Sequence, residues 1–248
     1  MKAKRKTVLI IISVLLVLLI TVAVYFFQFD HTGYAMTIPV RNSFTQIGEN
    51  VYINSNNAKS PEEILALIKQ AEERVGAFYG DLHYKDETVI IVCDDTGLKE
   101  KLGGGKSTFT MTIPSKKHYI CLSDDYFNLD IVSHEITHAE LHTRLSVSAL
   151  NSIPSWFDEG IATQNDYREQ YSEENWIART DNGKNAIALE DMDEPSEFYA
   201  GEVDDRRFRY INAKHEVAQW MEEHKTEGLL ALIDRINNGE DFQAVYGK

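Results

Sequence analysis

Hydrophobic positions beyond residue 49 recur with a helical period in some segments and alternate or cluster in short runs in others. A helix is predicted to begin after Ser60, because proline follows the serine and a glutamate stands three residues beyond it, which is typical of a capped helix start. From there to about Tyr79, apolar residues recur at helical spacing, so one face is expected to pack on a sheet. These residues are Ile64, Leu65, Ile68, Ala71 and Val75.

Short runs rich in β-branched and aromatic residues predict strands. They cover Asn50–Asn54, Thr88–Cys93, Phe109–Ile113 and His118–Leu122, with a short helix near Leu98–Leu102 and a glycine turn at Gly103–Gly105. From Asp125 onward the pattern is mostly helical. With no repeats and no low-complexity linkers, residues 50–248 are predicted to form one α+β unit, with a mixed β-sheet upper lobe and a helical lower lobe.

The N-terminus carries a second kind of pattern. Thr7 to Phe29 contains no charged residue, and a helix of this length is roughly 34 Å long, enough to cross a bilayer. A cleaved signal peptide is the alternative, but the apolar run is long for one and Ala23-Val24-Tyr25 is a poor cleavage site. We therefore expect an uncleaved single-pass anchor at 7–29, a cytoplasmic basic tail at 1–6, a linker at 30–49 and an extracytoplasmic domain after it.

Charge is distributed unevenly along the chain. The formal net charge is −14, and removing the four positive charges of the first six residues leaves −18 on the rest. Such an acidic body repels phosphate backbones, so no nucleic-acid partner is expected. These four basic residues, which are expected to keep the N-terminus in the cytoplasm, are Lys2, Lys4, Arg5 and Lys6.

Two features suggest chemistry that the surrounding residues do not support. Cys93 and Cys121 both lie in predicted strands, so a disulfide between neighbouring strands is conceivable, but two buried free thiols are favoured. The Gly103–Thr108 segment resembles the end of a phosphate-binding loop, but Glu100 stands where the first glycine is required. A predicted strand also follows where that loop needs a helix. A plain turn is therefore expected.

The strongest chemical signal is His134-Glu135-Ile136-Thr137-His138, an H-E-x-x-H sequence in a segment that Asn128 caps as a helix. Histidines four residues apart share a helix face, so both imidazoles can reach one ion. Glu135 lies one residue round from His134, where a general base can take a proton from water beside the metal. A chance match is expected in well under about one chain in a hundred.

A zinc site needs a third protein ligand, and His142 and Glu159 are the candidates. His142 lies a further turn along the same helix, about 12 Å from His134, too far to close a tetrahedral site between the two histidines. The metzincin pattern of zinc ligands also needs a glycine at position 141 and a histidine at position 144, where this chain has Leu141 and Arg144. Glu159 follows Pro154 on a predicted second helix, which can face the first.

These residues resemble a known family. H-E-x-x-H followed about twenty residues later by Trp156-Phe157-Asp158-Glu159-Gly160-Ile161-Ala162 is similar to the gluzincin clan of metallopeptidases, most closely to small bacterial peptidase-MA-like domains. The resemblance covers roughly residues 50 to 246. It implies a zincin-like fold, Zn²⁺ bound by His134, His138 and Glu159, and Glu135 as base. It also implies that the strand before the catalytic helix, His118–Leu122, forms the sheet edge and pairs with extended substrate.

The same resemblance implies a role for Tyr210. In many of these domains a tyrosine opens a later helix and donates a hydrogen bond to the developing oxyanion, and Tyr210 is expected to open such a helix here. A tyrosine packed in the core is the alternative.

Charged segments near Tyr210 bear on the substrate. The acidic stretches Leu189–Pro195 and Glu202–Asp205 could select basic substrates, although solvated loops are favoured. One of the arginines nearby could bind a substrate carboxylate, although a salt bridge to the neighbouring acids is the commoner use. These arginines are Arg206, Arg207 and Arg209.

Two functions follow from the sequence. The first is a membrane-anchored zinc metallopeptidase that hydrolyses a peptide or protein substrate outside the cytoplasm through water and Glu135. The second is a noncatalytic zinc module that serves recognition or regulation. Retention of Glu135 favours the enzyme, because a structural zinc site needs ligands but no base.

Overall fold

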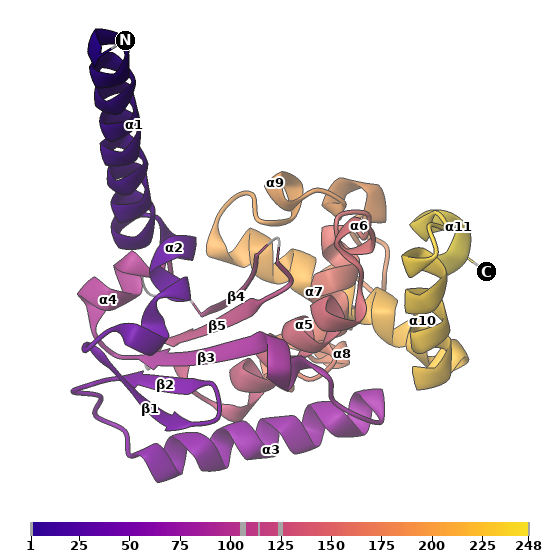
Figure 1. Ribbon diagram of the computed structural model, residues 1–248. Coiled ribbons are helices and arrows are strands. Elements are labelled where there is room, and N and C mark those ends of the chain that lie inside the picture. Colours follow the sequence, from indigo (N-terminus) through magenta and orange to yellow (C-terminus); the bar gives the residue numbers. More distant parts are fainter. Residues whose placement is uncertain (1, 105–107, 114, 124–125, 248) are drawn as a thin grey trace.

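The computed structural model describes residues 2–104, 108–113, 115–123 and 126–247, without the side chains of residues 2–5 (Figure 1). Helix α1 (Lys2–Phe29) projects away from the rest of the chain, and residues Lys6–Phe29 are long and apolar enough to cross a membrane or to act as a signal sequence. Gly105, the last residue of the predicted glycine turn, and Asp125, where the predicted helical part begins, lie outside the described residues.

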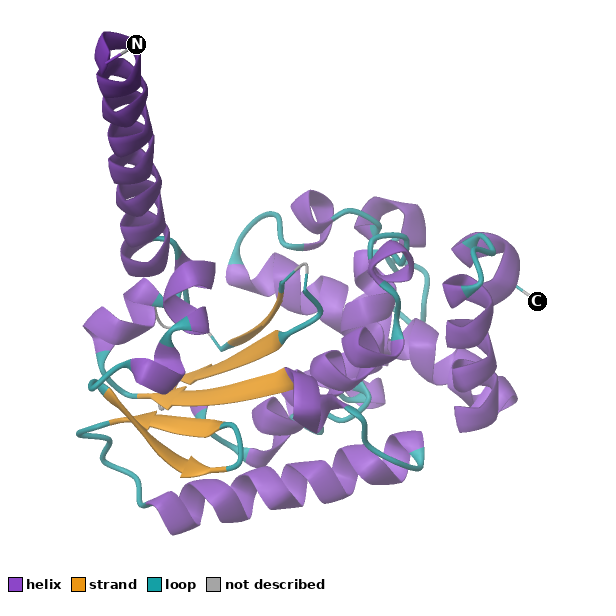
Figure 2. Ribbon diagram, in the orientation of Figure 1, coloured by secondary structure: helices purple, strands orange, loops and turns teal. Residues whose placement is uncertain are grey.

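The remaining chain is a mixed α+β fold built on a five-stranded sheet (Figure 2). The strands are β1 (Phe44–Gly48), β2 (Val51–Asn54), β3 (Thr88–Cys93), β4 (Phe109–Thr112) and β5 (His118–Ser123). Their order is β1-β2-β3-β5-β4, with β2, β3 and β5 parallel and the outer strands β1 and β4 antiparallel to their neighbours. The four predicted strands are therefore present, and β1 is an addition.

The expectation that His118–Leu122 forms the edge of the sheet is wrong. Strand β5 pairs with β3 on one side and with β4 on the other, so His118–Ser123 lies inside the sheet and has no free edge. Strand β4 pairs with β5 alone among the described residues, and it is therefore the edge strand on this side. The cause is the connection from β4 to β5, which is short enough to fold back as an antiparallel pair.

Residues 30–49 are folded and do not form the expected linker. Helix α2 (His31–Met36), the 3₁₀ turn η1 (Ile38–Val40) and strand β1 all fall within them. Tyr34, Ile38 and Phe44 are buried against one face of the sheet together with Ile91 and other apolar side chains. Burial of this apolar surface holds the segment in place.

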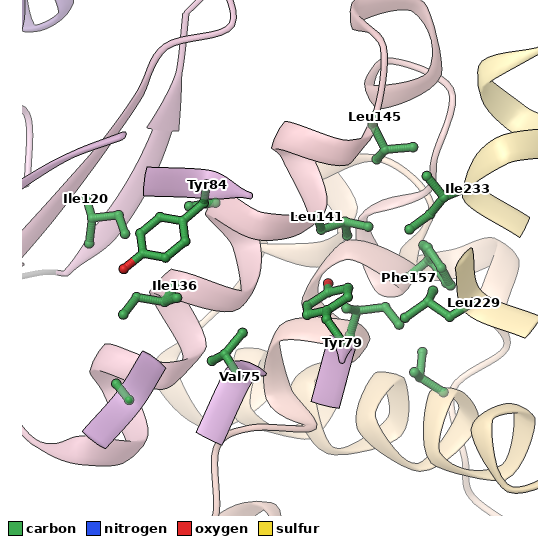
Figure 3. Close-up of a cluster of buried hydrophobic side chains, with 14 of the residues drawn as sticks. Val75, Tyr79, Tyr84, Ile120, Ile136, Leu141, Leu145, Phe157, Leu229 and Ile233 are labelled. Carbon is green, nitrogen blue, oxygen red and sulfur yellow. The ribbon is translucent and has the colours of Figure 1, made fainter. Parts of the chain in front are cut away.

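The opposite face of the sheet carries the main core. Helix α3 (Pro61–Tyr79) begins at Ser60 with the predicted capping box, in which Ser60 Oγ accepts from Glu63 N at 3.2 Å and a Glu63 carboxylate oxygen accepts from Ser60 N at 3.1 Å. It packs against α5 (Leu129–Arg144) under the sheet. Figure 3 shows Val75 and Tyr79 of α3, Ile120 of β5 and Ile136 of α5 as members of this core.

The second half of the chain is helical. Its central pair is α7 (Ser155–Thr163) and the long α10 (Val203–Asn237), which is broken at Lys225, where φ is 57°. Phe157 of α7 and Leu229 and Ile233 of α10 close the core in Figure 3. The smaller elements are α4 (Thr96–Lys101), α6 (Val147–Leu150), α8 (Glu173–Thr180), α9 (Pro195–Phe198), α11 (Phe242–Tyr246), and the 3₁₀ turns η2 (Tyr84–Glu87), η4 (Glu169–Tyr171) and η5 (Leu189–Met192).

Both cysteines are buried free thiols, as favoured from the sequence. Cys93 and Cys121 lie on adjacent strands but do not stand opposite each other, because Cys121 is in register with Ile91 and Cys93 with Ser123. Burial raises the pKa of Cys93 to about 11, so this thiol is held in its neutral form.

Candidate metal centre

His134 and His138 come together on the buried helix α5. Asn128 caps this helix as predicted, its side chain accepting from Ile131 N at 3.1 Å. Both histidines are 7% exposed, and their Nε2 atoms lie 3.1 Å apart. Two ring nitrogens therefore point at the same place from one helix face, as the four-residue spacing requires.

Glu159 approaches the same place from α7. Its Oε2 atom lies 3.3 Å from His134 Nε2 and 3.3 Å from His138 Nε2. The next residue, Gly160, makes this approach possible, because a Cβ there would lie 2.5 Å from Val217 and 2.7 Å from the Ala213 carbonyl oxygen on α10. A glycine thus lets α7 sit close against α10 with the carboxylate turned toward α5.

The three atoms fit a tetrahedrally bound zinc ion. Bonds of 2.0–2.1 Å at tetrahedral angles separate ligand atoms by about 3.3 Å, close to the three distances between His134, His138 and Glu159. Glu159 Oε2 is also buried and accepts no hydrogen bond from any residue that the structure describes, which is costly unless a cation or proton satisfies it. These buried groups can therefore hold a metal ion.

Charges around the three residues agree with a cation site. Burial alone would raise the pKa of Glu159, but His138 and His134 hold it well below its usual range. Burial would lower the pKa of His138, but Asp158 and Glu159 raise it well above its ordinary value. The cluster thus has an excess of negative charge that positive charge must balance, whether protons or a metal ion supply it.

Asp158 is a residue that the sequence analysis did not assign. Its Oδ1 lies 2.8 Å from Nδ1 of His138, and its Oδ2 lies 2.9 Å from Nε2 of His142. The first contact places a proton on Nδ1 of His138 and leaves Nε2 free to bind a cation. The sequence offered one indication of this role, since Asp158 directly precedes the predicted ligand Glu159. Consecutive helix residues project about 100° apart, so the two carboxylates can contact different neighbours.

His142 lies one turn beyond His138 on α5 and forms a second cluster with His138 and Asp158. Its Nδ1 lies 2.8 Å from the hydroxyl of Thr112 on β4, and the same hydroxyl lies 2.8 Å from Nδ1 of His118 on β5. A continuous chain of polar contacts therefore runs from His118 to Asp158 and on to His138. It ties the edge of the sheet to the metal centre.

Glu135 lies at the wall of the site with a partner on the edge strand. Its Oε2 accepts a hydrogen bond of 2.7 Å from Thr110 Oγ1 on β4. Burial raises its pKa above the ordinary value, although the neighbouring His134 and His138 act in the opposite direction. A raised pKa makes the carboxylate a better proton acceptor, which is what a general base requires.

Two tyrosines complete the site. Tyr210 packs against the rings of His134, Tyr171 and Phe198, with ring centroids 6.2, 5.7 and 5.1 Å away. It does not open its helix, because α10 begins at Val203, two turns earlier. The sequence analysis missed Tyr199, whose hydroxyl donates to the second oxygen, Oε1, of Glu159. The residues around Tyr199 in the sequence do not indicate this contact, because Tyr199 follows α9 and lies 40 positions from Glu159.

Two cavities meet at the metal centre. The first has a volume of about 410 Å³ and is called the Arg206 cavity, because Arg206 lines it. His142, Asp158 and Tyr199 line it as well. The second, of about 270 Å³, is named the Arg168 cavity and is lined also by Ile131 and Tyr171. His134, Glu135, Tyr210 and Thr108 line both. The metal centre therefore stands between two spaces, each large enough for part of a ligand.

The acidic stretches lie elsewhere. Residues 189–195 and 202–205 contribute no described residue to either cavity. Asp193 accepts a hydrogen bond of 2.9 Å from the buried Trp156, and Asp204 pairs with Arg179 at 2.8 Å. These acids have structural roles here.

Comparison with known proteins adds no relative: no protein-family model matches the chain, and no curated protein has a significantly similar sequence. The functional argument therefore rests on the site itself.

Proposed function

We propose that this protein is a zinc metallopeptidase of the gluzincin kind, with the sheet as the upper lobe and the helices around α7 and α10 as the lower lobe of a zincin-like fold. The observation that carries the proposal is the convergence of His134 Nε2, His138 Nε2 and Glu159 Oε2 at 3.1–3.3 Å, with Glu135 beside them. Structural zinc sites close with four protein ligands, whereas three ligands leave a position open for chemistry.

In this proposal Glu135 is the general base. Zinc bound at the three residues would supply Lewis acidity that makes a nucleophile available near neutral pH. Glu135 would accept the proton from the attacking water and deliver it to the leaving amine, as its raised pKa favours. Thr110 holds the Glu135 carboxylate toward β4 at 2.7 Å, which fixes the direction of that proton transfer.

The remaining groups bind and orient the substrate. An extended peptide would add to the open edge of β4 by main-chain hydrogen bonds, with Phe109 and Thr110 alongside the metal centre. Tyr210 lines both cavities, so its hydroxyl is suited to donate to the developing oxyanion. Tyr199 would keep Oε1 of Glu159 occupied, so that Oε2 alone faces the histidines.

The apolar helix places this activity at a membrane in our proposal. Residues Lys6–Phe29 would remain as a single-pass anchor, and the basic residues before them would keep the N-terminus in the cytoplasm. The metal centre would then act on peptides or proteins outside the cytoplasm.

Replacement of Glu135 by glutamine tests the enzyme directly. Glutamine keeps the size of the side chain but cannot accept the proton, so hydrolysis of any cleaved peptide should fall by about 10²–10⁴-fold while zinc remains bound. His138→Ala is the matched variant, which should lose most of the zinc. Full zinc with unchanged hydrolysis in Glu135→Gln contradicts the mechanism. Zinc-loaded wild-type protein that cleaves nothing in a broad peptide library favours a noncatalytic zinc module.

A further inference from the structure

Arg206 is the only arginine or lysine among the described residues that line the Arg206 cavity. It is partly buried in the first turns of α10, and it shares the cavity with Glu135, Asp158 and Glu159. Within the described part of the chain its guanidinium makes no ion pair and no side-chain hydrogen bond. An arginine that faces a cavity without a protein partner is available to a ligand.

The carboxylates of the cavity are already engaged. Asp158 contacts His138 and His142 at 2.8 and 2.9 Å. Glu159 faces the two proposed histidine ligands and accepts from Tyr199.

The acids next to Arg206 on its own helix are engaged as well. Asp204 pairs with Arg179 at 2.8 Å, and Asp205 accepts from Glu202 N at 2.9 Å in the cap of α10. Among the residues that the structure describes, Arg206 therefore does not form the salt bridge that commonly explains such an arginine.

The Arg168 cavity gives an internal comparison. Arg168 also lines a cavity at the metal centre, but it forms an ion pair with the buried Asp166 and lies over the ring of Tyr171, 5.0 Å from its centroid. Its charge is neutralised within the protein. The two cavities thus differ in the charge that they offer to a bound peptide.

We infer that Arg206 binds a carboxylate of the substrate, so that the Arg206 cavity selects peptides that carry a free C-terminus or an aspartate or glutamate side chain close to the cleaved bond. This inference rests on the proposed peptidase function. A guanidinium binds a carboxylate through two parallel hydrogen bonds, which gives orientation as well as affinity.

Peptide binding tests the inference without requiring turnover. Full-length zinc-loaded Glu135→Gln protein in detergent micelles is titrated with a set of fluorescein-labelled hexapeptides. Each sequence is prepared with a free C-terminus, with a C-terminal amide, and as the amide with one internal glutamine changed to glutamate. The free-acid and amide arms test the terminal carboxylate, and the glutamate and glutamine arms test the side chain.

We expect one carboxylate-bearing version to bind at least about tenfold more tightly than its uncharged counterpart. Adding Arg206→Gln should remove this preference and leave the affinity for the uncharged peptides within about twofold. Arg207→Gln is the matched control, because Arg207 is exposed and lines a different groove with Arg179, so the preference should remain. Equal affinity of all versions, including no measurable binding by any, overturns the inference, as does a preference that Arg206→Gln retains.

The same peptides, incubated with wild-type protein and analysed by mass spectrometry, separate this inference from the proposed function. If the carboxylate preference in binding depends on Arg206 but no peptide is cleaved, the carboxylate site stands and the peptidase proposal fails. If peptides are cleaved equally with and without a carboxylate, the peptidase proposal stands and the role of Arg206 fails.

Discussion

Asp158→Asn tests how far the residues behind the proposed ligands determine metal binding. The carboxylate of Asp158 lies 2.8 Å from Nδ1 of His138 and 2.9 Å from Nε2 of His142. Asparagine has nearly the same size, but it has one acceptor oxygen where aspartate has two and carries no charge. The NH₂ group of asparagine can only donate hydrogen bonds. The histidine N–H that faces this group would therefore lose its acceptor.

The expected effect is a loss of zinc affinity with the fold retained. Asp158 holds His138 in the tautomer that leaves Nε2 free, and it would add negative charge next to a metal ion bound there. Loss of such a partner typically weakens metal binding by about 10–100-fold, or about 1.4–2.7 kcal/mol. The dissociation constant should therefore rise by this factor, measured by competition with a chromophoric chelator of known zinc affinity at pH 7.5.

Glu173→Gln is the matched control for this measurement. Glu173 lies 2.8 Å from Nδ1 of His215, which repeats the carboxylate–histidine contact at a distance from the metal centre. This variant should bind zinc like the wild type. A zinc dissociation constant within about twofold of wild type for Asp158→Asn, or an equal weakening in Glu173→Gln, would refute the reasoning. Circular dichroism of both variants checks that each remains folded.

Three other outcomes are expected. Tyr210→Phe should reduce kcat by no more than about 10²–10³-fold, the effect of one lost oxyanion donor, and unchanged kcat would assign Tyr210 to packing. A reporter fused after Lys248 should be active only outside the cytoplasm with the protein in the membrane fraction, whereas secreted chains beginning after Ala23 or Ala35 would show a cleaved signal. Burial lowers the pKa of His118 to about 4 in the folded protein. As the pH falls, His118 is therefore protonated in the unfolded chain before it is protonated in the folded one, and stability should fall between about pH 6.5 and 4. After allowance for solvent screening, metal-free His118→Gln should lose about 1–2 kcal/mol less than wild type over this range in urea unfolding, and equal losses would contradict the assignment.

Local sequence was sufficient for elements whose signals are local. The Ser60 cap, the apolar spacing of α3, the start of α5 after Asn128 and the β3 run Thr88–Cys93 each depend on residues within a few positions of one another. Two histidines four residues apart on a helix must share a face, so the sequence also predicted that His134 and His138 point to one place. Glu159 could be proposed because the start of its helix was readable from Pro154.

Other features depend on contacts between distant segments, and local sequence carries no record of them. The edge strand is β4 and not β5, because strand order follows from which strands pair across the sheet. Residues 30–49 fold because Tyr34, Ile38 and Phe44 find apolar partners on strands far along the chain. Tyr199 reaches Glu159 across 40 positions.

The same division applies to the site. The sequence by itself determined the H-E-x-x-H helix face, the apolar N-terminal helix and the acidic charge of the body. Tertiary structure decided that three ligand atoms converge within about 3.3 Å, that Asp158 stands behind His138, and that Arg206 alone of its neighbours faces the cavity unpaired in the described chain. The reason is physical: helical and hydrophobic periodicity act within a segment, whereas partner choice and desolvation depend on which segments meet.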